Sequence, residues 1–194
     1  MAKKNINNTK GKIVSAAWKL FYEQGYDDTT VEEIILKSGT SKGSIYHYFS
    51  GKDSLLSSLS YLFDEKYEEI RPELDNIESC FEKLLFLNRE LFDMIENNIS
   101  LDLLARLYSS QIVTTGEKHL LDHNRLYYKL LRSIVSDGQK SGELTSDMTS
   151  NEIVKSYAML ERAFLYDWCL CNGDYSLKTY AQKMMPKFLS EFRL

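Results

Sequence analysis

Residues 29–53 read TTVEEIILKSGTSKGSIYHYFSGKD, and this stretch decides the fold. Thr30 and Glu33 have the spacing of a capping box, which predicts the start of a short helix. Gly39 suits a tight turn, because glycine adopts left-handed backbone angles without a Cβ penalty. Ser41 can then cap a second short helix over residues 42–49. The stretch therefore predicts a helix-turn-helix.

The second helix has the side chains needed to contact DNA in the major groove. Ile45 and Phe49 are four residues apart and can anchor it to a core. The other positions offer a positive charge, hydroxyls, an imidazole and aromatic rings, which suit phosphate oxygens, base edges and thymine methyls. The predicted DNA-binding residues are Thr30, Ser41, Lys42, Gly43, Ser44, Tyr46, His47, Tyr48 and Lys52.

A wider set of residues matches, in type and in ungapped spacing, the pattern of a known family of DNA-binding domains. It comprises Ile13-Val14-Ser15-Ala16-Ala17, Leu20-Phe21, Gly25-Tyr26, Thr29-Thr30-Val31, Ile34, Gly39, Ser41-Lys42-Gly43-Ser44-Ile45-Tyr46, Tyr48-Phe49, Lys52-Asp53 and Leu55-Leu56. In these positions residues 12–56 resemble the DNA-binding domain of the tetracycline-repressor (TetR) family. Two positions depart from the usual pattern: Ile35 replaces a small alanine and Lys12 replaces a common arginine.

The resemblance implies an all-α protein with two domains. Residues 1–53 would form an N-terminal arm and a three-helix helix-turn-helix domain. Residues 54–194 would form a larger helical domain for effector binding and dimerisation. The implied function is a ligand-responsive transcriptional regulator, in its simplest form a repressor. It would bind a palindromic double-stranded DNA operator as a homodimer and be released by a small molecule.

Lys52 and the charge distribution support a DNA contact. A cation is unfavourable at a helix N-terminus, but a phosphate there accepts hydrogen bonds from the lysine and from free backbone N–H groups. In the family, a lysine at this position contacts phosphate. The net charge of the chain is −4, yet residues 1–53 hold eight lysines and six acidic residues, which concentrates positive charge beside the recognition helix.

Composition favours long helices in a reducing compartment. Only 2 of the 194 residues are Pro and 9 are Gly, and 43% are hydrophobic. No apolar run reaches membrane-spanning length and no apolar signal region opens the chain, so we expect a cytoplasmic protein without a membrane contact. Three cysteines are an odd number without framework spacing, which disfavours a disulfide scaffold.

Helical spacing of apolar residues continues to the C-terminus and predicts nine helices. A capping box at Ser50 and Asp53 would open the fourth, which Arg71-Pro72 would stop. Thr149 and Glu152 have the same spacing, and Pro186 should kink the last helix. The expected ranges are 9–24, 31–38, 42–49, 51–71, 73–98, 101–112, 120–139 and 150–171, with a last helix that starts at residue 176.

Aromatic residues beyond residue 54 are consistent with a core, a dimer interface and an effector cavity. Family resemblance favours a cavity for an apolar or aromatic effector with a few polar groups. The predicted cavity residues are Phe63, Phe86, Tyr108, His123 and Tyr127. The predicted dimer residues, on the last two helices, are Tyr157, Leu160, Phe164, Trp168, Tyr180, Met184 and Phe188.

Other chemistry has weaker support. His119 and His123 are four apart on a predicted helix and could bind a metal or a polar ligand, but no third ligand is evident. Cys169 and Cys171 would point in nearly opposite directions, which favours packing. No nucleophile elbow, phosphate loop or acid pair occurs, so we expect neither an enzyme nor a cofactor. The alternative function is a helical protein-interaction module, which salt dependence would distinguish from DNA binding.

Overall fold

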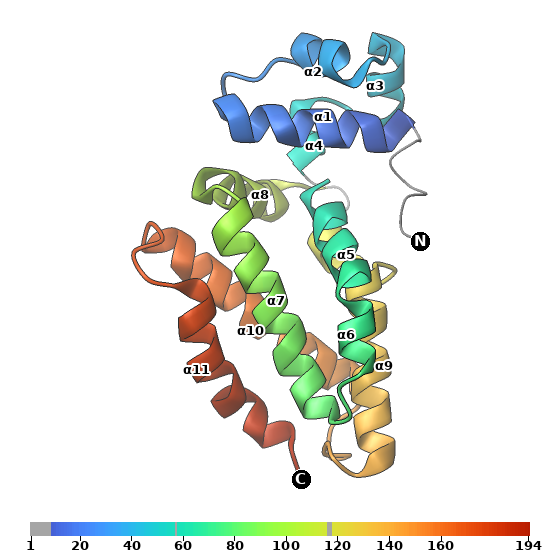
Figure 1. Cartoon of the computed structure of the whole chain (residues 1–194), viewed down its shortest axis with the longest axis vertical. Helices are drawn as coiled ribbons and strands as arrows, with labels where there is room; N and C mark the ends of the chain where they lie inside the picture. The colour runs from blue at the N-terminus through green and yellow to red at the C-terminus, as the bar shows by residue number, and fades with distance from the viewer. Residues whose placement is uncertain (1–8, 57, 116–117) are drawn as a thin grey trace. The chain divides into compact units, whose positions relative to one another are not determined.

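The computed structural model describes residues 9–56, 58–115 and 118–194 (Figure 1). These residues form eleven α-helices and two 3-10 turns, and they contain no strand. The all-α prediction is therefore confirmed, but the count of nine helices is wrong. The difference arises because the region 51–71, predicted as one helix, contains both α4 (Lys52–Leu56) and α5 (Leu59–Glu69), and a separate α6 (Arg71–Asp75) follows.

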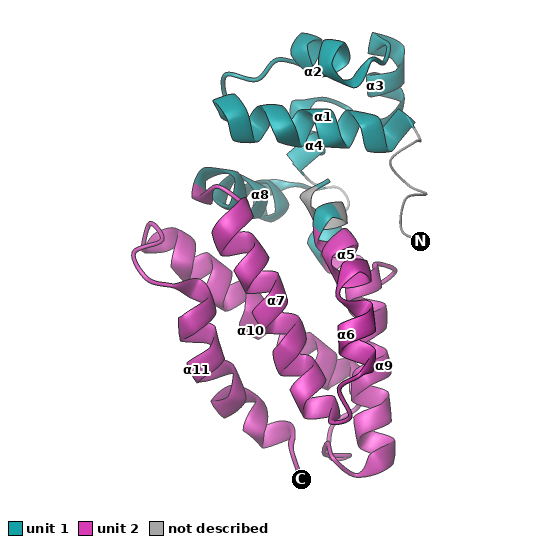
Figure 2. Cartoon of the chain, in the orientation of Figure 1, with its two compact units in different colours: residues 1–62, 102–120 teal, residues 63–101, 121–194 magenta. Residues whose placement is uncertain are grey.

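The chain divides into two compact units (Figure 2). Unit 1 comprises residues 1–62 and 102–120, and unit 2 comprises residues 63–101 and 121–194. Unit 1 holds α1 (Thr9–Gln24), α2 (Val31–Ser38), α3 (Lys42–Tyr48), α4, nearly all of α8 (Leu101–Val113) and most of the turn η1 (His119–Leu121). The sequence division at residue 53 did not anticipate that α8 belongs with the helix-turn-helix.

In unit 1, α1 packs against both α2 and α3. Ile13, Ala17 and Phe21 of α1 are fully or almost fully buried, and so are Ile34 of α2 and Ile45 of α3. Each of the two short helices therefore contributes a buried isoleucine to a core that α1 supplies. Isolated helices of seven or eight residues are marginal in water, so this burial is what stabilises them.

The ends of α2 and α3 follow the sequence prediction. Thr30 and Glu33 form the complete capping box, and the side chain of Ser41 accepts a hydrogen bond from the Ser44 amide. Gly39 ends α2 with φ at +64°. The predicted box at Ser50 and Asp53 involves a side chain, that of Asp53, outside the described part of the structure.

Trp18 joins α1 to the segment between α4 and α5. Its indole Nε1 donates to the Ser58 hydroxyl at 2.8 Å, and both side chains are buried. Leu55 and Leu56 of α4 are buried as well. Because buried polar groups are costly without a partner, this bond specifies where the chain leaves the helix-turn-helix.

Unit 2 contains most of α5, from Phe63 onward, and all of α6. It also holds α7 (Cys80–Asn98), α9 (Leu126–Ser141), α10 (Ser150–Leu170), α11 (Leu177–Leu189) and the turn η2 (Ser190–Phe192). Helix α7 packs against α6, α9 and α11, and α10 packs against α9 and α11 (Figure 1). The predicted capping box of α10, formed by Thr149 and Glu152, is present.

Three helix boundaries in unit 2 differ from the sequence prediction. Helix α5 ends before Ile70, and Pro72 lies in the first turn of α6, where its missing N–H removes no helical hydrogen bond. Helix α7 begins at Cys80, after the cap Ser79, rather than at residue 73. Helix α9 begins at Leu126 rather than at residue 120.

Gly39→Ala tests the turn between α2 and α3. An added Cβ meets no atom within 4 Å, so the cost is the left-handed conformation itself, roughly 1–2 kcal/mol of unfolding free energy. Gly43→Ala is the matched control, since Gly43 lies within α3 and its Cβ would contact only the Ser41 hydroxyl at 3.8 Å. We expect this control to stabilise the protein by up to about 1 kcal/mol. Urea unfolding measures both, and equal effects of the two substitutions would contradict the assigned turn.

Candidate nucleic-acid interface and effector site

One face of α3 is anchored and the others are open to solvent. Ile45 is buried in the core of unit 1, and Phe49 follows it at the end of the helix with 6% exposure. The solvent-exposed residues are Lys42, Gly43, Tyr46, His47 and Tyr48. The His47 and Tyr48 rings meet edge to face at 4.7 Å. The structure thus places five of the predicted DNA-binding residues together on an accessible surface.

Three predicted DNA-binding residues also have structural roles in capping. Thr30 both accepts from the Glu33 amide and donates to the Glu33 carboxylate at 2.8 Å. The hydroxyls of Ser41 and Ser44 lie 2.9 Å apart. These contacts set the orientation of α2 and α3, so loss of any of these hydroxyls would affect helix placement as well as any DNA contact.

Lys42 is available for a phosphate. Its ammonium lies 3.5 Å from the Glu32 carboxylate, with the two side chains 65% and 71% exposed. Ion pairs this exposed contribute at most about 1 kcal/mol. A DNA phosphate can therefore replace the glutamate at little cost.

Lys52 is engaged within unit 1. Its Nζ donates to the backbone carbonyls of Tyr26 at 2.8 Å and Asp27 at 3.2 Å, and it lies 4.3 Å from the centre of the Tyr26 ring. Lys52 thereby holds the connection between α1 and α2 against the start of α4. Its predicted phosphate contact stays a prediction, and it requires the ammonium group to leave these carbonyls.

Arg106 of α8 binds the same connection and was missed by sequence reasoning. Its guanidinium lies 2.5 Å from the Asp27 carboxylate and 2.8 Å from that of Asp102, and 5.2 Å from the Tyr26 ring centre. The Asp102–Arg106 pair has visible i, i+4 spacing. The decisive partner, Asp27, lies 79 residues away in the sequence, where no local pattern could reveal it.

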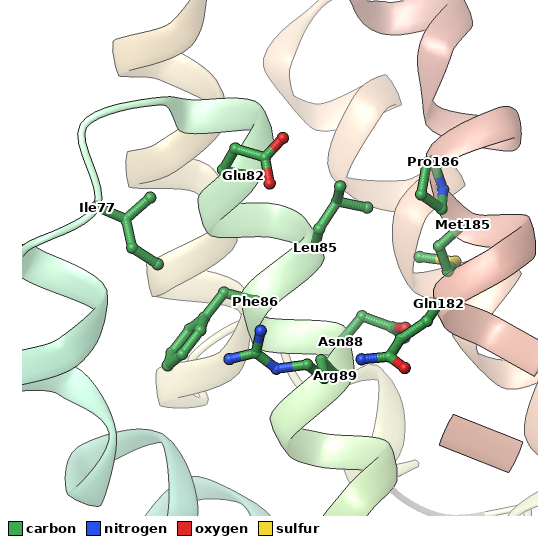
Figure 3. Close-up of a pocket in the computed structure, with 9 residues that line it drawn as sticks. All are labelled: Ile77, Glu82, Leu85, Phe86, Asn88, Arg89, Gln182, Met185 and Pro186. Atoms are coloured by element: carbon green, nitrogen blue, oxygen red, sulfur yellow. The ribbon is translucent and has the colours of Figure 1, made fainter. Parts of the chain in front are cut away.

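Unit 2 has a hollow of about 480 Å³ between α7 and α11 (Figure 3). Phe86 and Asn88 of α7 line it, opposite Gln182 and Met185 of α11. The guanidinium of Arg89 covers the Phe86 ring at 4.9 Å. Apolar and polar side chains both face the hollow, so it could hold a small amphipathic molecule.

A second hollow of about 680 Å³ lies between α9 and α10. His123 and Tyr128 line it from the α9 side, and Val154, Ala158 and Arg162 line it from α10. Both hollows fall within the size range of small-molecule sites, roughly 300–1,000 Å³.

The five predicted cavity residues do not line one hollow. Phe86 lines the α7–α11 hollow and His123 the α9–α10 hollow, whereas Phe63 and Tyr127 are buried in unit 2. Tyr108, on α8, belongs to unit 1. Their assignment to a single cavity therefore remains a prediction.

His119 and His123 are not on one helix, because α9 begins only at Leu126. His119 lies in η1, and His123 lies in the turn that follows. The i, i+4 alignment that suggested a shared ligand is therefore wrong. Within the described residues, no group of three or more His, Cys, Asp or Glu side chains could hold a metal ion.

Glu161 is a carboxylate buried among three helices of unit 2. It accepts from the Tyr127 hydroxyl of α9 at 2.6 Å and from the Asn88 amide of α7 at 3.0 Å. Desolvation raises the pKa of the Glu161 carboxyl above its ordinary value, although both donors oppose the shift. Asn88 also lines the α7–α11 hollow, so a ligand there would lie one side chain away from this carboxylate.

The predicted dimer residues fall into three groups by exposure. Tyr157, Phe164 and Trp168 are buried within the protomer, and the Tyr157 hydroxyl donates to the Leu84 carbonyl at 2.8 Å. Leu160 and Met184 are half-buried, and Tyr180 and Phe188 are exposed. The buried group can offer little area to a second chain, because its hydrophobic surface is already covered by its own protomer.

Sequence reasoning missed a separate apolar stripe on α10. Met159, Tyr166 and Leu170 are 53%, 50% and 63% exposed, and Ala163 lies between them on the same face. Their spacing is helical and continuous. The sequence did not single out this stripe, because α10 has apolar residues on more than one face. Only the packing of the helix shows which of these faces is buried.

The comparisons with known proteins address the helix-turn-helix and the whole fold. Residues 13–59 match the protein-family model described as bacterial regulatory proteins of the tetR family. The chain is 37% identical over 62 residues to the regulator QacR of Staphylococcus aureus, covering 32% of this chain and 33% of that protein. It is 26% identical over 137 residues to the fatty acid metabolism regulator protein of Bacillus subtilis, covering 69% of each.

The helix-turn-helix of residues 13–59 is a DNA-binding domain of the TetR family. Among solved structures, Thermus thermophilus FadR in complex with lauroyl-CoA aligns with a TM-score of 0.77 at 22% identity, covering 96% of each chain. This likeness concerns the fold. Among the described residues, none of the helices combines the length and the apolar character that crossing a bilayer requires.

Two substitutions of Glu161 separate its charge from its hydrogen bonds. A raised folded pKa means that the wild type loses stability as pH rises from about 4.3, the ordinary value for glutamate, through the folded value. Glu161→Gln should abolish this pH dependence. Glu161→Ala should destabilise the fold by roughly 1–3 kcal/mol for each donor left without its acceptor. Urea unfolding between pH 4 and 8 tests both, and an unchanged pH profile in Glu161→Gln would refute the raised pKa.

Proposed function

We propose that this regulator is a homodimeric repressor that reads a palindromic operator with α3. The observation that carries the proposal is the exposed face of α3, with Lys42, Tyr46 and His47 open to solvent on a helix anchored through Ile45. A helix of seven residues contacts few bases, so two copies on a two-fold site are needed for useful specificity.

The apolar stripe on α10 supports dimerisation. Tyr180 and Phe188 of α11 pack on Phe164 with ring centres 5.9 and 6.1 Å apart, and both remain exposed on their outer sides. Together with Met159, Ala163, Tyr166 and Leu170 they offer an apolar face on α10 and α11. Paired with its symmetry mate, this face would form an isologous contact of four helices.

Release by an effector would act through α7 and α8. Helix α7 lines the hollow in Figure 3, and α8 follows it after only Ile99 and Ser100. Helix α8 in turn binds the α1–α2 connection through Arg106 and Asp27. A small molecule, apolar or aromatic in part, that displaces α7 would therefore shift α8 and the recognition helix that the same unit holds. The lauroyl-CoA held by the related T. thermophilus FadR makes acyl-CoAs a sensible first group of compounds to test.

Operator binding tests the proposal directly. Operator fragments are first selected from the source genome with the full-length protein. Lys42→Ala and Tyr46→Phe should then each weaken binding by roughly 1–3 kcal/mol where the contact is to a base. Lys129→Ala is the control, since Lys129 is an exposed lysine of α9 in the other unit. Fluorescence anisotropy at several salt concentrations measures affinity and the number of phosphate contacts. Unchanged operator affinity in both α3 variants, with folding intact, would exclude α3 as the helix that contacts the bases.

The same titration distinguishes the alternative function, a helical protein-interaction module. A DNA-binding surface loses affinity steeply as salt rises, because counterions are released from several phosphates. Selection that recovers no enriched sequence, together with weak and sequence-independent binding, would favour the protein-interaction module.

Tyr166→Glu tests the dimer. The side chain is half exposed, so a charge there should leave the protomer folded but give monomers and abolish tight operator binding. Val113→Glu is the control, with 77% exposure on α8. Phe164→Glu is unsuitable, because Phe92, Tyr180 and Phe188 surround that ring within the protomer. Light scattering with circular dichroism reports both properties, and a Tyr166→Glu protein that stays dimeric would place the interface elsewhere.

A further inference from the structure

We propose that the hollow between α9 and α10 binds an amphipathic organic anion, whose carboxylate or phosphate pairs with Arg132, Lys155 and Arg162. The inference rests on the proposed function and adds to it a second effector site, distinct from the α7–α11 hollow, with a stated chemical class of ligand. It concerns a place that the sequence did not single out apart from His123.

The charge of the hollow is one-sided. Arg132 of α9 and Lys155 and Arg162 of α10 line it together with His123, and no Asp or Glu is among its lining residues in the described structure. Unit 2 as a whole holds 14 Lys and Arg against 20 Asp and Glu. Three cations in one concavity of an acidic unit produce a local positive potential that attracts anions.

The three cations form none of the close ion pairs that other basic residues of the described structure form. In unit 2, Arg125 pairs with Asp64 at 2.9 Å and Lys178 with Asp93 at 2.7 Å. Within residues 9–56, 58–115 and 118–194, Arg132, Lys155 and Arg162 form no ion pair of this kind. Their charges therefore repel one another without a direct ion pair, although Arg162 also attracts the neighbouring buried Glu161, and a bound anion would relieve the repulsion.

Two of the cations are already oriented by the protein. Arg132 Nη2 donates to the His123 carbonyl at 2.8 Å, and Arg162 Nη1 donates to the Tyr128 hydroxyl at 3.4 Å. Each guanidinium keeps further N–H donors, because arginine has five. Such preoriented guanidinium groups suit the two oxygens of a carboxylate or the several of a phosphate.

The floor of the hollow is apolar. Val154 and Ala158 of α10 are buried, and so is the Tyr128 ring, which meets the His123 ring at 4.6 Å. The volume of about 680 Å³ exceeds what a single inorganic anion needs. A ligand with an anionic head and a short apolar part would use both the cations and this floor.

The position of the hollow offers a path to the core of unit 2. Tyr128 and Arg162, which face the hollow, are the chain neighbours of Tyr127 and Glu161, whose side chains are hydrogen-bonded to each other at 2.6 Å in the core. An anion that draws Arg162 outward would act on the residue next to Glu161. Because Glu161 also binds Asn88 of α7, occupancy could bias α7.

Three probes of equal chain length test the site on the full-length protein: octanoate, octyl phosphate and octanol. Binding is measured by calorimetry, and stabilisation by the melting temperature, without DNA and in a buffer free of phosphate and carboxylate. We expect one or both anions to bind and to raise the melting temperature, with affinity falling as salt rises, and octanol to do neither. Tighter binding of octyl phosphate than of octanoate would indicate a phosphate-bearing effector, and the reverse order a carboxylic acid.

Variants locate the binding. Arg132→Gln and Lys155→Glu should each reduce anion affinity at least tenfold, whereas Lys129→Gln, an exposed lysine of α9 outside the hollow, should not. Lys155 is exposed, so its substitution keeps the test valid if an arginine variant folds poorly. Failure of both anions to bind, equal binding of octanol, or unchanged affinity in Lys155→Glu would overturn the proposal.

A DNA measurement separates this site from the proposed function. If the anion binds as described, operator affinity is measured with and without it. Loss of operator affinity on anion binding supports the effector role, since linkage between the two sites is reciprocal. Anion binding by a protein that has no operator would refute the proposed repressor and leave the anion site standing.

Discussion

The angle between α2 and α3 depends on one backbone conformation, the left-handed φ of +64° at Gly39. The Gly39 amide bonds to the Leu36 carbonyl at 3.3 Å, and the Thr40 amide to the Ile35 carbonyl at 3.3 Å, which ends α2 and reverses the chain. This geometry lets Ile34 and Ile45 enter the same core beneath α1. With Ile45 buried, the opposite face of α3 must point outward. The whole candidate DNA-binding surface therefore follows from a turn that only glycine adopts without strain.

Unit 1 is more than a helix-turn-helix, because α8 is built into it. Lys52 and Arg106 approach the Tyr26 ring with 4.3 and 5.2 Å to its centre, and each also binds the α1–α2 connection. The chain leaves unit 2 at Leu101, the first residue of α8, and the rest of α8 belongs to unit 1.

Unit 2 is organised around a buried carboxylate. Glu161 links α10 to α9 through Tyr127 and to α7 through Asn88. A buried ionisable group is a weak source of stability, and an apolar residue of similar volume is often as good. Asn88, which is bonded to Glu161, lines the α7–α11 hollow, and Tyr128 and Arg162, the chain neighbours of Tyr127 and Glu161, line the α9–α10 hollow.

The sequence by itself determined the local features of this protein. It predicted the all-α class, the capping boxes at Thr30 and Thr149, the turn at Gly39, and which side of α3 is anchored, because caps, turns and helical periodicity act over a few neighbouring residues. Only the tertiary structure decided what depends on distant residues. It buried Tyr157, Phe164 and Trp168 within the protomer, left Met159, Tyr166 and Leu170 outside, and joined Arg106 to Asp27. The sequence pattern of an apolar residue is the same whether the residue lies in a core or at an interface. An ion pair between residues 79 positions apart produces no recognisable local spacing. These features depend on packing between residues that are distant in the sequence, so no single stretch of the chain determines them.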